Sequence, residues 1–495
     1  MTTQTATHSD GIPIVSKSND PGAIAINGNL KLKVLPAKFY DQFLSDAAKE
    51  LQPSPIRGLF PLEKKPGVIS LLAGKPNQST FPFTSLSFTA KNPTNDGSET
   101  TINIPQDQLA PGLQYSDTAG IPDLLRWITG LQERSHGRKH GRNDGTGEEG
   151  WRVSMGSGSQ DLIFKSARII LNPGDSILVE SPVYASVFCF FLEVPTDADG
   201  IPKALYTVPY GCNPTGMTAS TQRRKEVLRL ARKHNFIILE DDPYYFLYYG
   251  KADPRPPSYF SLEATEPSGE EEGQSYAEVG RVLRFDSLSK ILAAGLRIGF
   301  STGKSNRFRY NIFAAGPEIF LAKVDTLTTS ANLQVSSLTQ LITYRLLQSW
   351  GYDTFLLHTQ NVSNFYKEKR DIFERALQKW LGGGIPEQSE GETDEGKLAE
   401  WNTPQAGMFF WFKLLVEDPS TAAADQEGDS RALIETHAYA NGVLALPGTV
   451  FLPNGSKTAY VRASFSLLSE DQVVEAIKRL RKTVLEVRRS KQEAS

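Results

Sequence analysis

The sequence feature that most constrains the fold is a series of short apolar runs separated by stretches with helical spacing. Four such runs lie at 176–180, 204–208, 236–239 and 281–285. Runs that are apolar throughout are typical of strands buried on both faces, as in a parallel sheet covered by crossover helices. The sequence therefore predicts an α/β fold around a mostly parallel sheet.

The chain is too long for a single hydrophobic core. It has 495 residues, whereas one core stops growing at about 250–300 residues. After Trp350 the pattern changes to a long helix, expected at 354–380, and then two strand-like runs at 407–412 and 459–465. This pattern indicates a second, α+β unit. We expect a flexible tail at 1–30, a large domain at 66–350, and a small domain built from 31–65 and 351–495.

The composition argues for a soluble chain that acts on small molecules. Lys and Arg (53) nearly balance Asp and Glu (56), so no overall field favours nucleic acid or an anionic membrane. Two cysteines, Cys189 and Cys212, cannot form a disulfide framework, and no histidine has metal-ligand spacing. No apolar run approaches the ~20 residues that cross a bilayer, and 1–20 lack a targeting pattern. We expect a cytoplasmic location and no metal.

Lys290 is the first candidate for chemistry. The segment Ser287-Leu-Ser289-Lys290 directly follows the apolar run 282–285 and precedes Arg297. A lysine just beyond a buried strand lies where open α/β sheets bind ligands. Desolvation there lowers the amine's pKa and favours Schiff-base formation with an aldehyde. The two hydroxyls and Arg297 could then bind a phosphate, although a single lysine is most often a solvated surface charge.

Four further segments carry weaker signals. Glu240–Tyr245 ends another apolar run, and a carboxylate there could pair with a ring nitrogen, hold magnesium or cap a helix. Met155–Gln160 contains two glycines ahead of a helix expected at 161–170, a pattern that suits an anion or a plain turn. Asn213-Pro214 and Arg462 are each, taken separately, usually structural.

In this chain order the segments resemble the fold-type I aminotransferases, which depend on pyridoxal phosphate, from about residue 53 to about residue 480. The nearest resemblance is to the aromatic, kynurenine and 2-aminoadipate aminotransferases. It implies transfer of the amino group of such an amino acid to a 2-oxo acid such as 2-oxoglutarate, with pyridoxal phosphate in the large domain. It also implies a homodimer with shared active sites. The matching segments are Ser54–Arg57, Leu113–Ser116, Ala119–Pro122, Glu240–Leu247, Asp286–Lys290, Gly295–Phe300 and Ala406–Trp411.

The resemblance also implies a role for each matching residue. Lys290 would hold the cofactor and move the proton, Asp242 would keep the pyridine nitrogen protonated, and Tyr184 would stack on the ring. Arg462 would bind the substrate's α-carboxylate through two parallel hydrogen bonds, which lysine cannot form. The implied cofactor-binding residues are Ser159, Gln160, Tyr184, Asn213, Asp242, Tyr245, Ser287, Ser289, Lys290 and Arg297, with Tyr115 reaching across the dimer. The implied substrate-binding residues are Arg57, Gly74, Asn213 and Arg462.

Two stretches depart from the family pattern. The chain between Tyr184 and Leu205 is shorter than in the family, which predicts the loss of a helix that covers the sheet and therefore a poorly stable protein. Residues 309–322 also differ from the family's simpler helix. Two acidic stretches, 263–278 and 386–397, are expected to be mobile surface loops.

Other functions remain open at this point. A pyridoxal-phosphate lyase or decarboxylase would keep Lys290 and Asp242, and the shortened 185–204 region would suit a catalytically weakened relative. The same fold also serves as a sensor in transcription regulators, but that needs a basic helix-turn-helix before Pro53, and the first 52 residues lack its charge. A cofactor-free relative kept for interaction is the third alternative. An absorbance spectrum would separate it from an enzyme.

Overall fold

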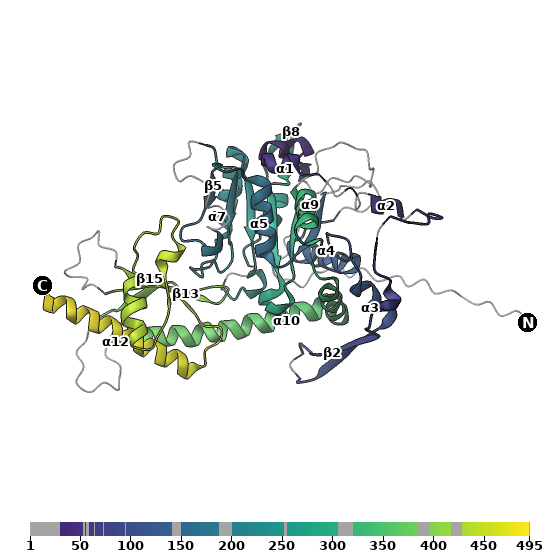
Figure 1. Ribbon diagram of the computed structural model, residues 1–495. Helices are drawn as coiled ribbons and strands as arrows, with labels where there is room; N and C mark the ends of the chain where they lie inside the picture. Colours follow the sequence, from purple (N-terminus) through teal and green to yellow (C-terminus); the bar gives the residue numbers. More distant parts are fainter. Residues whose placement is uncertain are drawn as a thin grey trace, which may run out of the picture.

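In the computed structural model a long helix, α10 (Ser337–Leu381), extends from beside the larger sheet to a second, smaller sheet (Figure 1). Beyond Gly351, whose φ of 68° breaks its regular geometry, α10 continues toward the second sheet. The residues described are 30–52, 55, 59–63, 65–72, 74–94, 96–140, 150–187, 200–251, 255–304, 320–383, 396–416 and 428–494.

The larger sheet has six strands in the order β4-β11-β10-β7-β6-β5. Neighbours from β10 through β5 are parallel, and β11 runs antiparallel to both β10 and β4. All four predicted apolar runs form strands of this sheet, so the predicted α/β fold with a mostly parallel sheet is confirmed. The strands are β4 (Trp151–Gly156), β5 (Ile177–Val179), β6 (Ala204–Thr207), β7 (Ile237–Asp241), β10 (Val282–Ser287) and β11 (Gly299–Lys304).

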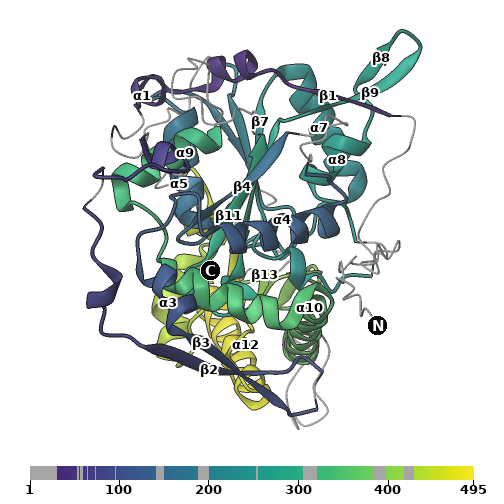
Figure 2. The ribbon, with the colours of Figure 1, turned by 90° about the vertical axis from the view of Figure 1, so that its right-hand side faces the viewer.

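Helices cover both faces of this sheet (Figure 2). Helices α5 and α9 lie on one face, and α7 and α8 lie on the other. Every residue of β7 and β10 is buried, as expected for strands covered on both faces. The predicted helix at 161–170 is confirmed as part of α5. The covering helices are α4 (Pro122–His136), α5 (Ser159–Ile170), α7 (Thr221–His234), α8 (Tyr259–Thr265) and α9 (Phe320–Asn332).

The smaller sheet is antiparallel, with four strands in the order β12-β13-β15-β14. Helix α10 packs against it through Phe373, whose ring stacks on that of Phe410 at 4.9 Å. The helix predicted at 354–380 is therefore the second part of α10. The remaining elements here are β12 (Ala399–Trp401), β13 (Phe409–Leu414), α11 (Ser430–Ala432), β14 (Leu446–Pro447), β15 (Tyr460–Ser464) and α12 (Glu470–Ala494). The residue boundaries predicted for two domains stay a prediction.

The sequence indicates a largely helical segment at 31–51 and a mobile loop at 263–278, and the structure differs from both. The stretch after residue 30 begins with a strand, β1 (Lys31–Val34), and only then forms a 3-10 helix (Ala37–Phe43) and α1 (Asp46–Glu50). The acidic stretch 263–278 is ordered structure, because it contains the hairpin of β8 (Gly269–Glu271) and β9 (Gln274–Val279). Its acidic composition does not indicate the two features that order it. One is a tight turn at Glu272-Gly273, where both residues have positive φ, and the other is the pairing of β9 with β1.

Between β1 and the large sheet the chain forms a second hairpin and two helices. β2 (Ser85–Lys91) pairs with β3 (Glu99–Pro105), while α2 (Phe60–Glu63) and α3 (Gln106–Leu113) lie before and after this hairpin. Near the larger sheet's edge strand β5, Leu178 is 40% exposed and Ile201 is 78% exposed. Of the shortened region, 185–204, residues 188–199 lie outside the described residues. So do 305–319, which include most of the atypical stretch 309–322, and 384–395, which include most of the acidic stretch 386–397. The missing-helix prediction therefore stays a prediction.

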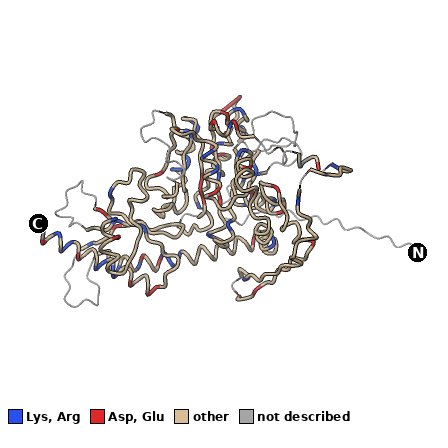
Figure 3. The backbone as a smooth tube through the Cα atoms, viewed as in Figure 1, with Lys and Arg blue, Asp and Glu red and all other residues tan. Residues whose placement is uncertain are grey.

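Charged residues of both signs alternate along the whole fold (Figure 3). Among the described residues the view shows no face of a single sign, which agrees with the near balance of the composition. In the described part of the chain no helix is long and apolar enough to cross a membrane.

Candidate functional site

Lys290 lies at the end of a short 3-10 turn (Leu288–Lys290) that directly follows β10. The Ser287 hydroxyl caps this turn by accepting a hydrogen bond from the Ser289 N–H at 3.2 Å. The Lys290 side chain is half-buried. Burial lowers the pKa of its amine, Arg297 lowers it further, and the carboxylate of Asp241 opposes both effects. An amine that gives up its proton more readily is a better nucleophile toward an aldehyde.

Beside Lys290, Arg297 and the N-terminus of α5 form a cradle for an anion. Arg297 has a left-handed backbone (φ 52°), which directs its guanidinium to the Ser289 hydroxyl at 3.2 Å and the Ser157 carbonyl at 3.0 Å. Ser159 and Gln160 are the first two residues of α5, where backbone N–H groups have no partner within the helix. The structure thus brings together four residues predicted to meet a phosphate.

Two glycines allow this close approach. Gly158 has a φ of 89°, and a Cβ built there would lie 2.4 Å from the Arg297 guanidinium. A Cβ on Gly299 would lie 2.5 Å from the backbone carbon of Gly158 and 2.6 Å from the Ser159 nitrogen. The cradle therefore depends on the absence of side chains at both positions.

Gly299→Ala should weaken binding of the cofactor's phosphate, because β11 must move away from the N-terminus of α5. We expect affinity for pyridoxal phosphate to fall roughly tenfold or more, the loss that one charge-assisted contact brings. Titrating cofactor-free protein with pyridoxal phosphate measures this. Gly295→Ala is the matched control, because a Cβ there meets nothing within 4 Å. Equal affinities in the two variants would contradict the cradle.

Arg462 of β15 faces the larger sheet from the smaller one. Its Nη1 donates a hydrogen bond to Asn213 Oδ1 at 2.9 Å, which places two predicted substrate-binding residues in contact. The guanidinium carbon lies 4.3 Å from the ring centre of Phe409 and 5.1 Å from that of Phe451. Its Nε is buried and has no hydrogen-bond partner among the described residues. A carboxylate could satisfy that side of the guanidinium.

Tyr184 connects the cradle to this arginine. Its hydroxyl lies 3.4 Å from Gln160 Oε1, and its charge contributes to the pKa shifts of Arg462 and of Tyr244. Tyr184 therefore lies close to both Gln160 and Arg462. The predicted stacking of Tyr184 on a cofactor ring stays a prediction.

The structure places Asp242 away from Lys290. Asp242 follows β7, and its Oδ2 accepts a hydrogen bond from Arg284 Nη1 at 2.8 Å in the buried interior. Arg284 also binds Asp286 at 2.7 Å and lies 3.3 Å from Glu240. Asp242 shares this face of the sheet with Glu240 and Arg284, and its predicted pairing with a ring nitrogen stays a prediction. The face toward Lys290 belongs to Asp241.

Asp241 is the carboxylate that the structure brings to the site. Its carboxylate raises the pKa of Lys290, and the Ser159 side chain lowers the pKa of Asp241. Asp241 Oδ2 accepts a hydrogen bond from the Tyr206 hydroxyl at 2.7 Å. Burial raises the pKa of Asp241 to about 6. Within the described residues its buried Oδ1 has no partner. Asp242 Oδ1 also lacks a hydrogen-bond partner, so this observation does not separate the two carboxylates. The strand faces do separate them, because Asp241 is the one on the side of Lys290, and a protonated ring nitrogen fits there.

The same one-residue shift applies to the neighbouring tyrosines. The Tyr245 hydroxyl donates to the Ser135 carbonyl at 2.7 Å, and its ring lies 4.7 Å from that of His136. It therefore faces α4, and the predicted contact of Tyr245 with the cofactor stays a prediction. The buried Tyr244 instead lies near Asp241, Arg462 and Tyr184, which all contribute to the pKa shift of its hydroxyl.

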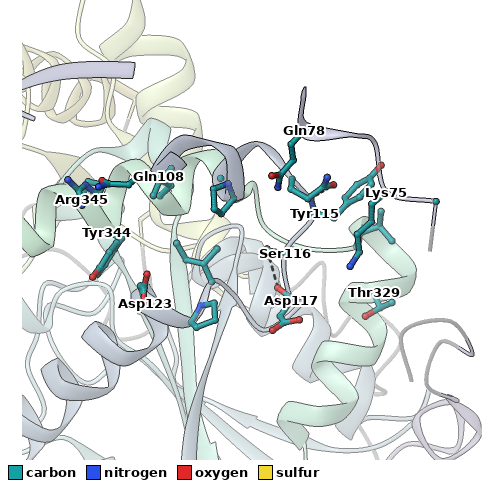
Figure 4. A pocket seen from close by; sticks show the side chains of 18 of the residues that line it. Lys75, Gln78, Gln108, Tyr115, Ser116, Asp117, Asp123, Thr329, Tyr344 and Arg345 are labelled. Atoms are coloured by element: carbon teal, nitrogen blue, oxygen red, sulfur yellow. Dashed lines mark hydrogen bonds between the residues drawn. The ribbon is translucent and has the colours of Figure 1, made fainter. Parts of the chain in front are cut away.

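The remaining predicted residues lie elsewhere. Gly74 and Tyr115 line a cavity of about 1230 Å³ between α3, α4, α9 and α10. Figure 4 shows Tyr115 beside Lys75 at one end of this cavity, with Tyr344 and Arg345 at the other. Lys290 does not line it. Arg57 falls outside the described residues. The described residues include no cluster of His, Cys, Asp and Glu that could hold a metal.

The sequence-based assignment placed Asp241 on the face away from the ring and did not include Tyr206 or Tyr244. One signal favours Asp241. Arg284 lies between the apolar residues Leu283 and Phe285 of β10, and a buried arginine needs carboxylates on its own face. In the register of β7 and β10 it lies opposite Glu240, which assigns Glu240 and Asp242 to that face and leaves Asp241 for the other.

An amine suited to attack an aldehyde, next to a cradle suited to a phosphate, requires a ligand that carries both groups on one ring. Pyridoxal phosphate is such a ligand, and the unpartnered oxygen of Asp241 fits its ring nitrogen. The fold and the site therefore define a pyridoxal-phosphate-dependent transferase of fold type I.

Comparison with known proteins identifies the family. The profile of aminotransferase class I and II matches residues 205–480. Aminotransferase tdiD of Emericella nidulans is 37% identical over 462 residues, covering 88% of this chain and 94% of that protein. The mitochondrial kynurenine/alpha-aminoadipate aminotransferase of Mus musculus is 34% identical, covering 90% and 99%. The chain belongs to the class I and II aminotransferases, as the resemblance implied, and it is a pyridoxal-phosphate-dependent aminotransferase.

A solved structure supports the fold independently. Aminotransferase Aro8 from Candida albicans superposes with a TM-score of 0.73, covering 93% of this chain and 99% of that one. At 24% sequence identity this likeness concerns the fold alone. The fungal and mouse relatives are both named aminotransferases, so the lyase and the weakened relative are not favoured.

Proposed function

We propose that this aminotransferase takes the amino group from an aromatic L-amino acid, kynurenine or 2-aminoadipate and passes it to a 2-oxo acid such as 2-oxoglutarate. The names of its relatives support this donor class. The observation that carries the proposal is that Lys290, Asp241 and Arg462 lie in one part of the structure. Asp241 raises the pKa of Lys290, Asp241 and Arg462 both act on the pKa of Tyr244, and Tyr184, which also acts on Arg462, lies 3.4 Å from Gln160 Oε1 in the cradle.

Arg462 binds the substrate first in this proposal. Its guanidinium is held by Asn213 and by the rings of Phe409 and Phe451, so little side-chain freedom is lost when a carboxylate arrives. All amino donors and 2-oxo acceptors share the α-carboxylate. Arg462 therefore orients every substrate in the same way and presents Cα to Lys290.

Lys290 has two tasks in the proposed mechanism. It attaches the cofactor covalently, and after the substrate has displaced it, its amine removes the proton from Cα and later returns it. Pyridoxal phosphate, when bound, supplies the aldehyde and a ring that accepts the electrons released at Cα. The lowered pKa of Lys290 suits the amine to the base step.

We assign the electrostatic partner of the ring nitrogen to Asp241 rather than Asp242, and the tyrosine beside the ring to Tyr244 rather than Tyr245. Asp241 holds a negative charge where the ring nitrogen needs a proton, and Tyr206 fixes its orientation. Ser159, Gln160, Ser289 and Arg297 hold the phosphate. The Ser287 hydroxyl accepts a hydrogen bond from the Ser289 N–H, so Ser287 positions Ser289.

The test of the proposed function is the visible spectrum of the purified protein with pyridoxal phosphate, before and after each candidate donor. Phenylalanine, kynurenine or 2-aminoadipate should convert the aldehyde form of the cofactor to its amine form, and 2-oxoglutarate should reverse the change. A spectrum that none of these donors alters would refute the donor class. A protein with no cofactor absorbance would refute the site.

Arg462→Lys should weaken all donors together. Lysine keeps the charge but cannot form two parallel hydrogen bonds, and it loses the flat contact with Phe409 and Phe451. We expect kcat/KM to fall about ten- to a hundredfold for every donor. Initial rates with one aromatic and one acidic donor measure this. A loss confined to one donor would place Arg462 at the substrate side chain instead. The predicted role of Arg57 at that side chain stays a proposal.

We also propose a homodimer with shared active sites. The extended segment around Ile69 and Leu71 leaves these two side chains 92% and 98% exposed, and Tyr115 in the nearby cavity is 54% exposed. Apolar side chains this exposed are typical of a surface that a partner covers. A second copy would cover the segment and bring Tyr115 to its phosphate. Light scattering that gives 54.6 kDa, the mass of one chain, would contradict the dimer.

The cytoplasm is the compartment we propose. The low cysteine count and the balanced charge support it. The mouse relative is named a mitochondrial enzyme, so fractionation of cells that produce the protein is the deciding measurement. Recovery in the mitochondrial fraction would overturn this proposal.

A further inference from the structure

His358 connects the helix between the two sheets to the turn that carries Lys290. Its Nε2 lies 2.6 Å from the carbonyl oxygen of Ile291, the residue directly after Lys290. A carbonyl only accepts, so the imidazole donates from Nε2, and it does so in both its neutral and its protonated form. The hydrogen bond thus joins α10 to the Lys290 turn across 67 residues of sequence.

Other contacts hold the beginning and middle of the Lys290 turn, including the hydrogen bond from Arg297 to Ser289. The N–H groups of Ile291 and Leu292 bond to the Leu288 carbonyl at 3.3 and 2.9 Å, which closes the turn on itself. The Leu288 N–H bonds to the Ile298 carbonyl at 3.0 Å and holds its beginning. The end of the turn is held from outside by His358, which fixes the direction in which the Lys290 side chain leaves the backbone.

His358 also lies beside the break in α10. The non-helical residue Gly351 separates the two parts of this helix, and the ring of Trp350, just before the break, lies 4.9 Å from the His358 ring, just after it. Further along α10, Phe373 packs on Phe410 of β13 and on Phe465. Phe465 directly follows β15, the strand that carries Arg462 and pairs with β13. Figure 1 shows α10 as the element that spans this whole distance.

We infer that His358 is a positioning residue, which holds the Lys290 turn in register with α10 and so with the sheet that carries Arg462. The inference rests on the proposed role of Lys290. Its consequence is that the distance between the group that binds the substrate carboxylate and the amine that takes the Cα proton is fixed through one helix. Binding at Arg462 and proton transfer at Lys290 are then coupled by the backbone of α10 rather than by a direct contact.

The test compares His358→Leu with His358→Gln in the holoenzyme. Both residues favour a helix, but only glutamine retains an N–H donor near the position of Nε2. His358→Leu should lower kcat about tenfold, the effect of one lost hydrogen bond on a reacting group, and leave KM for the donor within about twofold. The pH at which the absorbance of the lysine-bound cofactor changes should shift by roughly half a unit or more. His358→Gln should restore both values.

The exposed His437, changed to leucine, serves as the control and should alter neither value. Unchanged kcat and unchanged absorbance pH dependence in His358→Leu would overturn the inference. It would also be overturned if both His358 variants lost activity equally and in parallel with their melting temperature, because that result shows a purely structural role. Failure of the proposed function is distinguishable, because the unmodified protein would then lack the absorbance of a lysine-bound cofactor.

Discussion

Lys290→Ala is expected to have the largest effect of any single change in this chain. Alanine can neither attach the cofactor nor carry the Cα proton. General acid–base catalysis alone contributes about 10²–10⁴-fold to a rate. Turnover of any donor should therefore fall by at least this factor.

Mass spectrometry after borohydride reduction measures the attachment directly. The unmodified protein should gain the mass of the reduced cofactor on the peptide that contains Lys290, and Lys290→Ala should gain none. The matched control is Lys203→Ala, which removes a lysine that pairs with Asp175 at 2.6 Å at the start of the same sheet. A cofactor retained covalently in Lys290→Ala would show that another lysine performs the reaction.

The fold was predictable because its strongest signal is independent of packing detail. Strands covered on both faces are largely apolar, and the four largely apolar runs of the sequence form β5, β6, β7 and β10. The hairpin of β8 and β9 was not predictable in this way. Its acidic composition is typical of a loop, and it is ordered by backbone pairing with β1, a segment more than 200 residues earlier in the sequence.

The candidate site was predictable wherever residue type and position along the chain determine the chemistry. Ser289, Lys290 and Arg297 all lie between residues 289 and 297, so their proximity follows from the sequence. The contact of Arg462 with Asn213 joins residues 249 positions apart, and only the family resemblance anticipated it.

The sequence alone does not decide between Asp241 and Asp242, or between Tyr244 and Tyr245, as partners of the cofactor. Alternation along a strand shows that Asp241 and Asp242 lie on opposite faces, but it does not show which face holds the cofactor. That choice depends on Arg284, whose buried guanidinium binds Asp242 and Asp286. The sequence motif around Asp242 does not include Arg284, because Arg284 lies on another strand.

Asp241→Asn should lower kcat by about 10²–10³-fold, the loss typical when one fixed electrostatic partner of a developing charge is removed. Asparagine keeps the size of the side chain and an acceptor for the Tyr206 hydroxyl, so the cofactor should still attach to Lys290. What disappears is the negative charge that keeps the ring nitrogen protonated. Single-turnover rates with kynurenine, together with cofactor content, separate this loss from a loss of binding.

Asp242→Asn is the matched comparison, and it should retain turnover within about threefold. Three carboxylates, those of Glu240, Asp242 and Asp286, face the single guanidinium of Arg284. Burial raises the pKa of Asp242, and Arg284 opposes that rise. Because the cluster already holds more negative than positive charge, neutralising one member should be tolerated, and the amide oxygen can still accept from Arg284. If Asp242→Asn proved the more damaging variant, the cofactor would lie on the Arg284 face, and the assignment of Asp241 would be wrong.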